Sequence, residues 1–331
     1  MPTLLARHAS YGERGVVLHR PTNWRLVAAK LKRNPMLDLR DLECLSALAR
    51  HKHFARAAEA CGMSQPAFSM RIRNLEDRLE TQIVRRGNRF QGLTAEGEVV
   101  LSHGRAILDS TRALEEQVRA AKGEVIGRLR LGTIPTANTF AALVAVWLRA
   151  AHPGITLQID TTNSIALLQG LEDGAFDAAL TYTEGVATSL LNVEPLYGER
   201  YVLMLPSMLG EHDGGEITWT EAAEYPLILL EKEMQNRRII DQIFAEVGAE
   251  TQVVAETDGF TAMVAMAVEG MGAAVLPHVL IDRLGVFVGV SLLPLVGPVI
   301  EKSVGLVLPE RPQLTPAVQA LRDTVRKHIL S

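Results

Sequence analysis

The chain has 331 residues, 47% of them hydrophobic and 22% charged, and lacks a run of ~18 apolar residues that would predict a membrane span. This length exceeds one average domain, so we expect several domains, each with its own core. Only Cys44 and Cys61 are cysteines, which excludes a disulfide framework and a paired-cysteine zinc site; buried apolar thiols are favoured over a redox pair. The Arg-rich amino terminus lacks the apolar stretch and cleavage site of a secretory signal, so the cytoplasm is the expected location.

Charge is divided unevenly along the chain. Residues 1–92 carry 17 Lys/Arg against 8 Asp/Glu, whereas residues 93–331 carry 17 against 30. A basic amino-terminal part on an acidic remainder indicates that one part meets a polyanion and the other does not.

Residues 1–35 hold scattered Arg, Gly and Pro without sustained periodicity, and we expect them to be disordered. Two interpretations stay open. The segment is either a basic arm that contacts DNA phosphates or the result of an upstream start codon, with Met36 as the natural start. We favour the second.

From residue 37 onward the pattern becomes helical. Apolar residues from Leu42 to Ala49 share one helix face, and a second, Ala-rich helix follows Phe54. The turn Cys61-Gly62-Met63 then leads to Ser64, which can cap a third helix, with Pro66 in its first turn. Small residues and a glycine turn between two helices predict a helix-turn-helix.

The third helix has two faces. Phe68, Ile72, Leu75 and Leu79 form a buried stripe at 3.6-residue periodicity. The other side carries donors that suit base edges and phosphates in a DNA major groove. The predicted DNA-contacting residues on this helix are Ser64, Gln65, Pro66, Ser69, Met70, Arg71 and Arg73.

Residues 83–90 predict a β-hairpin wing with its tip at Gly87-Asn88. Side chains on such a wing reach phosphates or the minor groove. We expect DNA contacts from Arg85, Arg86, Asn88 and Arg89. For Arg71, Arg73 and Arg78 of the preceding helix, the alternative explanation is a solvated helix face on which they pair with Glu76, Asp77 and Glu80.

The segment FARAAEACGMSQPAFSMRIRNLEDRLETQIVRRGNRFQGLTAEGE, within residues 39–97, resembles the winged helix-turn-helix of LysR-type transcriptional regulators. The matching features include Ala57-Ala58, the run from Ser64 to Ala67, and Leu93-Thr94 after the wing. The resemblance implies a DNA-binding domain over residues 36–93 and double-stranded promoter DNA as partner.

Residues 94–122 predict one long helix with Thr94 as a plausible cap. Val100, Ile107, Leu114 and Val118 fall at heptad-compatible spacing, which favours packing against another helix. In the resembled family the counterpart is a linker helix that pairs subunits, which implies a homodimer or homotetramer. A helix packed on its own domain is the alternative, because Gly104 and Thr111 interrupt the seam.

Beyond Gly127, strand-like stretches alternate with helices, which predicts an α/β fold with mostly parallel strands. The predicted strands cover residues 128–133, 155–160, 177–182, 201–206, 227–230, 251–257, 273–277 and 304–309. Phrases such as AHPGITLQI and VEGMGAAVLP resemble the effector domain of the same family. This implies two Rossmann-like subdomains, similar to periplasmic binding proteins. We place subdomain I at about 127–199 and 268–300, and subdomain II at about 200–267 and 301–331.

Ligands of such folds bind beyond the carboxyl ends of the strands, near helix amino termini that suit anions. Polar loops follow the first two strands, and the resemblance points to Thr136 and to Asn163 or Ser164 as effector ligands. Arg237, at a predicted helix start, could pair with a carboxylate. Helix capping is the alternative role of the hydroxyl and amide groups, and a small organic anion is the effector class we expect.

Nothing in the sequence predicts catalysis. Gly270-Met271-Gly272 lacks the third glycine of a dinucleotide fingerprint, and no nucleophile elbow occurs. The histidines of the α/β part stand without metal-ligand spacing, so no metal or cofactor is expected. The sequence therefore predicts a non-enzymatic, ligand-responsive transcription factor, which would also contact RNA polymerase if it activates transcription. A small-molecule enzyme or solute-binding protein, and a nonspecific nucleoid protein, are the weaker alternatives.

Overall fold

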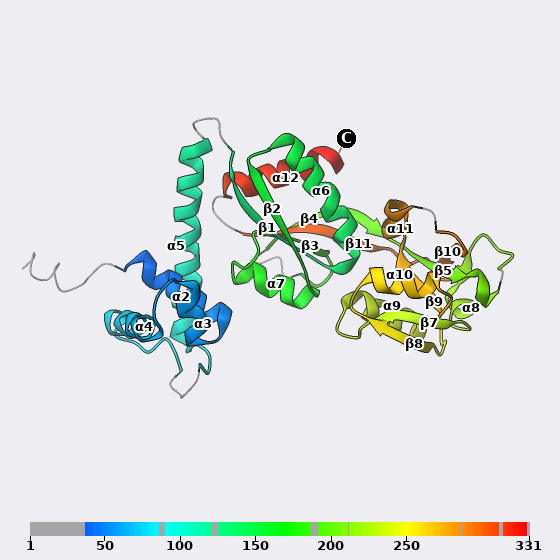
Figure 1. The fold of residues 1–331 in the computed structure, drawn as a ribbon, viewed down its shortest axis with the longest axis horizontal. Helices are drawn as coiled ribbons and strands as arrows, with labels where there is room; N and C mark the ends of the chain where they lie inside the picture. The colour runs from blue at the N-terminus through cyan, green and yellow to red at the C-terminus, as the bar shows by residue number, and fades with distance from the viewer. Residues whose placement is uncertain are drawn as a thin grey trace, which may run out of the picture.

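The computed structural model describes residues 37–85, 90–120, 125–186, 191–210, 212–285, 287–310 and 314–329. The segment 1–36 and three predicted wing residues, Arg86, Asn88 and Arg89, lie outside the described residues. Figure 1 shows the parts in chain order: a small helical domain, the long helix α5, and two α/β units. The predicted fold class is confirmed.

The helical domain is built from α2 (Leu39–His51), α3 (Phe54–Ala60) and α4 (Gln65–Leu79). Ser64 caps α4: its hydroxyl accepts a hydrogen bond from the Ala67 amide at 3.4 Å. Phe68, Ile72 and Leu75 of α4 are buried, which confirms the predicted apolar stripe. They pack against residues of α2 and α3, so the core fixes which face of α4 points outward.

A short antiparallel bridge between Val84 and Leu93 forms the base of the wing. The Arg85 amide donates to the Gly92 carbonyl at 3.0 Å, and the Thr94 amide donates to the Ile83 carbonyl at 3.1 Å. Gly97 lies directly beneath this base, where a Cβ atom would come within 2.1 Å of the Ile83 carbonyl oxygen. The wing therefore requires glycine at this position of the following helix.

Helix α5 (Ala95–Ala120) begins after Thr94, whose hydroxyl accepts a hydrogen bond from the Gly97 amide at 3.0 Å. Its first half packs on α2, where a Cβ at Gly104 would lie 3.1 Å from Leu42 Cδ2. Its second half reaches α12 of the first α/β unit. Helix α5 thus joins the helical domain to the rest of the chain (Figure 1).

Subdomain I contains a five-stranded sheet of order β2-β1-β3-β11-β4. Its core lies between the sheet and the helices α6, α7 and α12. Its strands are β1 (Gly127–Thr133), β2 (Ile155–Thr161), β3 (Ala178–Tyr182), β4 (Leu191–Glu199) and β11 (Lys302–Pro309). Its helices are η1 (Pro135–Ala137), α6 (Asn138–Ala151), α7 (Ser164–Glu172) and α12 (Pro316–Ile329).

Subdomain II contains a six-stranded sheet of order β6-β10-β5-β9-β7-β8. Separate apolar clusters cover its two faces. Its strands are β5 (Tyr201–Pro206), β6 (Ile217–Thr218), β7 (Pro226–Leu230), β8 (Gln252–Thr257), β9 (Ala273–Pro277) and β10 (Val290–Val296). Its helices are η2 (Ser207–Leu209), α8 (Trp219–Ala222), α9 (Gln235–Glu246), α10 (Phe260–Val268) and α11 (His278–Leu284).

The predicted assignment of the carboxy-terminal segments to the subdomains is wrong. Strands β9 and β10 belong to subdomain II, whereas β11 and α12 return to subdomain I. The chain crosses between the sheets twice, from β4 to β5 and from β10 to β11. At these crossings Arg200 Nε and Glu301 Oε2 lie 2.7 Å apart, so an ion pair joins the two connections.

The sheets are mixed rather than mostly parallel as predicted. Strand β11 runs antiparallel to both β3 and β4, and β5 runs antiparallel to β9 and β10. Two of the strands that the sequence did not predict, β4 and β10, contain Pro195 and Pro294. Proline weakens a strand pattern, and Pro195 lies in an edge strand beside a register shift.

Candidate nucleic-acid interface and ligand cavity

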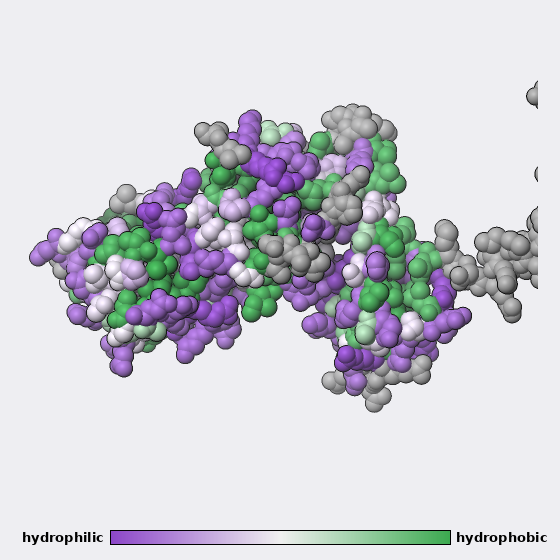
Figure 2. Space-filling model, turned by 180° about the vertical axis from the view of Figure 1, so that it is seen from behind, coloured by the Kyte–Doolittle hydropathy of each residue, from purple (hydrophilic) through white to green (hydrophobic). Residues whose placement is uncertain are grey.

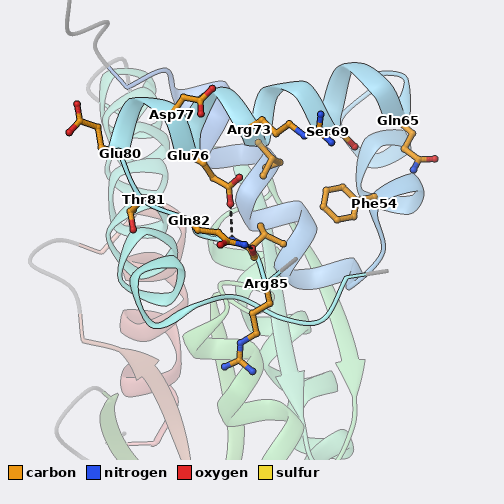
Figure 3. Close-up of a pocket in the computed structure, with 12 residues that line it drawn as sticks. Phe54, Gln65, Ser69, Arg73, Glu76, Asp77, Glu80, Thr81, Gln82 and Arg85 are labelled. Carbon is orange, nitrogen blue, oxygen red and sulfur yellow. Dashed lines mark hydrogen bonds between the residues drawn. The ribbon is translucent and has the colours of Figure 1, made fainter. Parts of the chain in front are cut away.

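The outward face of α4 forms one side of a groove that the wing base closes (Figure 3). Gln65, Ser69 and Arg73 line it from α4, and Arg85 lines it from the wing. Phe54 of α3 closes the inner wall through edge-on ring contacts with Phe68 and Phe90. Four predicted DNA-contacting residues are therefore brought together on one surface.

The remaining predicted residues of α4 are placed differently. Pro66 and Met70 are exposed on α4 but do not line the groove. Ser64 acts as the cap, which occupies its hydroxyl oxygen as an acceptor. Their contact with DNA stays a prediction.

Arg71 points toward α2 and not toward the groove. Its Nη1 atom lies 2.8 Å from Asp41 Oδ1 and 3.2 Å from Asp38 Oδ2. Arg78 Nη1 lies 2.7 Å from the other oxygen of Asp41, whose side chain is fully buried. A buried carboxylate needs such partners, so the structure gives Arg71 a role in holding α4 on α2. Contact of Arg71 with DNA stays a prediction.

Glu76 has a role that the sequence did not indicate. Its Oε1 accepts hydrogen bonds from the amides of Ile83 at 2.9 Å and Val84 at 3.0 Å (Figure 3). These bonds tie the start of the wing to α4. Glu76 is therefore an anchor of the wing rather than an ion-pair partner of the neighbouring arginines.

Helix α5 exposes an apolar stripe. Ile107, Leu114 and Val118, three of the four predicted seam residues, are 43%, 62% and 54% exposed, and Val99 is 58% exposed. Val100, the fourth, packs instead against the core of the helical domain. Hydrophobic residues can be followed along α5 in the view from behind (Figure 2). The stripe is left without a partner among the described residues of this chain.

A small cavity lies between the two subdomains. Thr136, Asn163 and Ser164 line it from subdomain I, as the sequence led us to expect of these loops. Gln235 and Asn236, at the start of α9, line it from subdomain II. Apolar walls are supplied by Ile134, Pro135, Leu230 and Met234, and Tyr182 completes the lining.

Two buried polar atoms at the cavity have no hydrogen-bond partner among the described residues. They are Ser164 Oγ and Asn236 Oδ1, on side chains that are at least nine-tenths buried. Unsatisfied buried polar atoms are costly and rare in native proteins. A polar ligand in the cavity could satisfy them, and the amino termini of α7 and α9 add free amide groups nearby.

Arg237 does not line the cavity. Its Nε atom lies 2.7 Å from Asp241 Oδ1, and its Nη1 lies 2.7 Å from both Glu256 Oε1 and the Leu230 carbonyl. The guanidinium therefore clamps α9 to the ends of β7 and β8. The predicted pairing of Arg237 with a ligand carboxylate stays a prediction; in this structure acidic partners of its own subdomain hold the guanidinium.

A buried hydrogen-bond chain behind the cavity was not predicted. Tyr182 donates to Glu199 Oε1 at 2.5 Å, and Asn236 Nδ2 donates to the Tyr182 hydroxyl at 3.3 Å. This chain links subdomain I to subdomain II beside the β4–β5 crossing. Burial raises the pKa of Glu199 to about 7, against the opposing effect of hydroxyl groups that face it. Because Tyr182 ends a predicted strand, its position at the cavity could have been inferred from the sequence.

Among the described residues, no three His, Cys, Asp or Glu side chains are grouped so that they could hold a metal ion. No helix in the described part of the chain is both long and apolar enough to cross a membrane.

Comparison with known families matches both parts of the chain. Residues 39–98 match the bacterial regulatory helix-turn-helix protein, lysR family. Residues 122–330, more than half of the chain, match the LysR substrate binding domain. The groove between α4 and the wing lies in the first match, and the cavity lies in the second.

Individual relatives agree with these matches. The chain is 26% identical to a hydrogen peroxide-inducible genes activator of Dickeya chrysanthemi, over 88% of this chain and 96% of the relative. It is 32% identical to the SDS degradation transcriptional activation protein of a Pseudomonas species, over the same shares of each chain. The solved structure of a full-length OxyR variant from Pseudomonas aeruginosa superposes with a TM-score of 0.70 at 23% identity, covering 88% of this chain and 95% of that one.

The superposition on the solved structure shows that the two proteins share a fold. The functions of the two domains follow from the family matches. Members of this family are transcriptional regulators and not enzymes. The chain therefore belongs to the LysR family and is a DNA-binding transcriptional regulator with an effector-binding domain.

Proposed function

We propose that the protein binds promoter DNA by inserting α4 into the major groove and placing the wing on the adjacent backbone. The observation that carries this proposal is the shared groove of Gln65, Ser69, Arg73 and Arg85. Gln and Arg can read base edges, whereas an arginine on a wing contacts phosphate. Glu76 supports the geometry because it ties the wing to α4.

A gel-shift assay with the duplex upstream of the protein's own gene tests this proposal. We expect tighter binding to this duplex than to random DNA, and affinity that falls steeply with salt because phosphate contacts release counterions. Equal affinity for both duplexes would contradict sequence-specific binding.

We infer that two copies pair through α5. The stripe formed by Val99, Ile107, Leu114 and Val118 is apolar and exposed, which is typical of a helix that packs on a second helix. A homodimer would cover this stripe, and pairing of dimers would give a homotetramer. Two DNA-binding arms then match a site with two half-sites.

Sedimentation of the Leu114→Asp variant tests the pairing surface. We expect a higher dissociation constant of the dimer, because a carboxylate would be buried in the seam. Ser102→Asp, an exposed change on another side of α5, is the control and should leave assembly unchanged. If Leu114→Asp sediments like the wild type, the stripe is not the interface.

We propose a small organic anion as effector in the cavity between the subdomains. The unpartnered hydroxyl of Ser164 and the amino termini of α7 and α9 favour a carboxylate. Thermal-shift measurements with small carboxylates and their uncharged primary amides test this class. A specific carboxylate should raise the melting temperature with concentration. Stabilisation by the amides alone would contradict an anion.

The relatives' names do not settle which signal this chain senses. Its only two cysteines, Cys44 and Cys61, precede the effector-binding domain, and burial raises the pKa of Cys44 to about 12. Thiol oxidation requires an accessible, reactive thiolate. We therefore propose a bound effector rather than a thiol in the effector-binding domain as the signal. The protein would act in the cytoplasm, with RNA polymerase as a further partner if it activates transcription.

A further inference from the structure

Helix α7 (Ser164–Glu172) reaches from the effector cavity to the linker helix α5. At its first turn, Ser164 lines the cavity and Asn163 Oδ1 accepts a hydrogen bond from the Ala166 amide at 2.9 Å. At its last turn, Arg105 Nη1 of α5 donates to the Glu172 carbonyl at 3.2 Å and lies 2.8 Å from Asp173 Oδ1. One short helix therefore contacts both functional regions.

Helix α7 is packed so that its two ends move together. Leu167 and Leu171 are buried in the core of subdomain I. A Cβ at Gly170 would lie 2.4 Å from Phe176 Cδ2, which shows how closely the helix approaches this ring. Close-packed elements shift as units and do not bend continuously. A displacement at Ser164 is therefore expected to reach Asp173.

Arg105 is well placed to receive that displacement. Its side chain is 14% exposed, and a cation at the carboxyl end of α7 is favoured by the terminal carbonyl groups. The preceding residue, Gly104, packs against Leu42 of the DNA-binding domain. Arg112 makes a second contact, 3.5 Å from Asp177, but its side chain is half exposed, so this pair is weaker.

We propose that α7 couples the effector cavity to the DNA-binding arm, with Arg105 as the positioning residue that holds α5 on the carboxyl end of α7. This inference rests on the proposed function, because it takes the cavity as the effector site. A ligand that moves Ser164 shifts Glu172 and Asp173 at the other end. Arg105 transmits the shift to α5 where that helix packs on the DNA-binding domain, and so changes the position of the recognition helix.

Hydrogen–deuterium exchange on the full-length Arg105→Gln variant tests the coupling without a known ligand. We expect amides at residues 165–168, at the cavity end of α7, to exchange about tenfold faster, because losing a charged hydrogen bond loosens the helix as a unit. Arg105→Lys should show a smaller change. Arg119→Gln, an exposed arginine of the same helix, is the control and should match the wild type.

The reverse direction is tested from the cavity. Gln235→Trp adds bulk to the cavity from α9, in place of a ligand. We expect it to change exchange at residues 101–112 of α5 by about threefold, and to lose this effect in the Arg105→Gln background, as coupled sites do in a double-mutant cycle. If Arg105→Gln fails to fold, Asp173→Asn breaks the same ion pair from the other side.

Faster exchange confined to residues 170–174 in Arg105→Gln would overturn the coupling. So would an effect of Gln235→Trp on α5 that persists without Arg105. The wild-type gel shift separates this inference from the proposed function. Specific DNA binding without exchange coupling overturns only the inference, whereas coupling without DNA preference overturns only the proposed function.

Discussion

Among the described residues, the DNA-binding domain and the effector-binding domain each contain one fully buried carboxylate, and the two have different kinds of partner. Asp41 is fully buried between α2 and α4 and is paired with the guanidinium groups of Arg71 and Arg78. Glu199 is fully buried at the crossing between the subdomains, where the groups that lower its pKa are the hydroxyls of Tyr182, Thr136 and Tyr201. The ion pairs of Asp41 hold the DNA-binding surface of α4 in place. The hydroxyl partners of Glu199 leave a polar site between the subdomains that can change its hydrogen bonds.

This contrast matches the tasks of the two domains. A recognition helix must present one fixed face to DNA, so α4 is held by charge pairs and by a packed apolar stripe. A sensing cavity must respond to a ligand, and it keeps polar atoms such as Ser164 Oγ and Asn236 Oδ1 unpartnered among the described residues. Unpaired polar atoms cost stability until a ligand satisfies them.

The largest effect is expected from Asp41→Asn. The amide cannot neutralise Arg71 and Arg78, so we expect the DNA-binding domain to lose about 3 kcal/mol of stability. This is measured as faster hydrogen exchange across residues 39–79. Asp77→Asn, an exposed change on α4, is the control. Unchanged protection in Asp41→Asn would show that the ion pairs do not hold α4.

The same chemical change at Glu199 is expected to have the opposite sign. Because the pKa of Glu199 is raised to about 7 in the folded protein, its protonated form is favoured there. The stability that this form provides is present below the unfolded pKa of about 4.5 and is lost as the pH rises toward 7. We therefore expect Glu199→Gln to be more stable than the wild type by about 3 kcal/mol at pH 8, and equally stable near pH 4.

Urea unfolding followed by the fluorescence of Trp147 and Trp219 measures this difference, because both tryptophans lie in the effector-binding domain. Glu224→Gln, at an exposed position, should show no such dependence on pH. A Glu199→Gln variant that is less stable at pH 8 would contradict a buried carboxyl that prefers its protonated form.

The smallest effects distinguish two arginines on α4. Arg73→Ala should weaken binding to the upstream duplex by about 1 to 2 kcal/mol and leave stability unchanged, because its side chain faces the groove. Arg71→Ala should mainly destabilise the domain, because its partner is Asp41. Affinity and melting temperature are measured for both variants. The assignment of the two faces fails if Arg71→Ala weakens DNA binding more than Arg73→Ala at equal stability.

Local signals made most of the DNA-binding domain predictable. The Ser64 cap and the stripe of Phe68, Ile72 and Leu75 are set by spacing along one helix, and the structure confirms both. The fate of Arg71 could not be predicted in this way. Its partner Asp41 lies 30 residues earlier, and only the packing of α4 on α2 brings the two together.

Long-range topology explains the errors in the effector-binding domain. Strand spacing cannot show that the chain returns to subdomain I at β11. The prediction therefore assigned the carboxy-terminal segments to the wrong subdomains. Tyr182, Glu199 and Asn236 meet at the cavity from separate parts of the chain. The sequence places Arg237 at a helix start without showing a partner for it. In the structure its guanidinium forms an ion pair with Glu256 of β8.

Hydroxyl-radical footprinting of the full-length protein on its own upstream duplex tests the central claim most directly. A dimer that places one α4 in each of two major grooves should protect two half-sites whose centres are separated by about 10 base pairs or a multiple of that spacing. The Arg73→Ala variant should lose protection at both half-sites together. Protection without a repeat, or a footprint that does not depend on Arg73, would contradict the account.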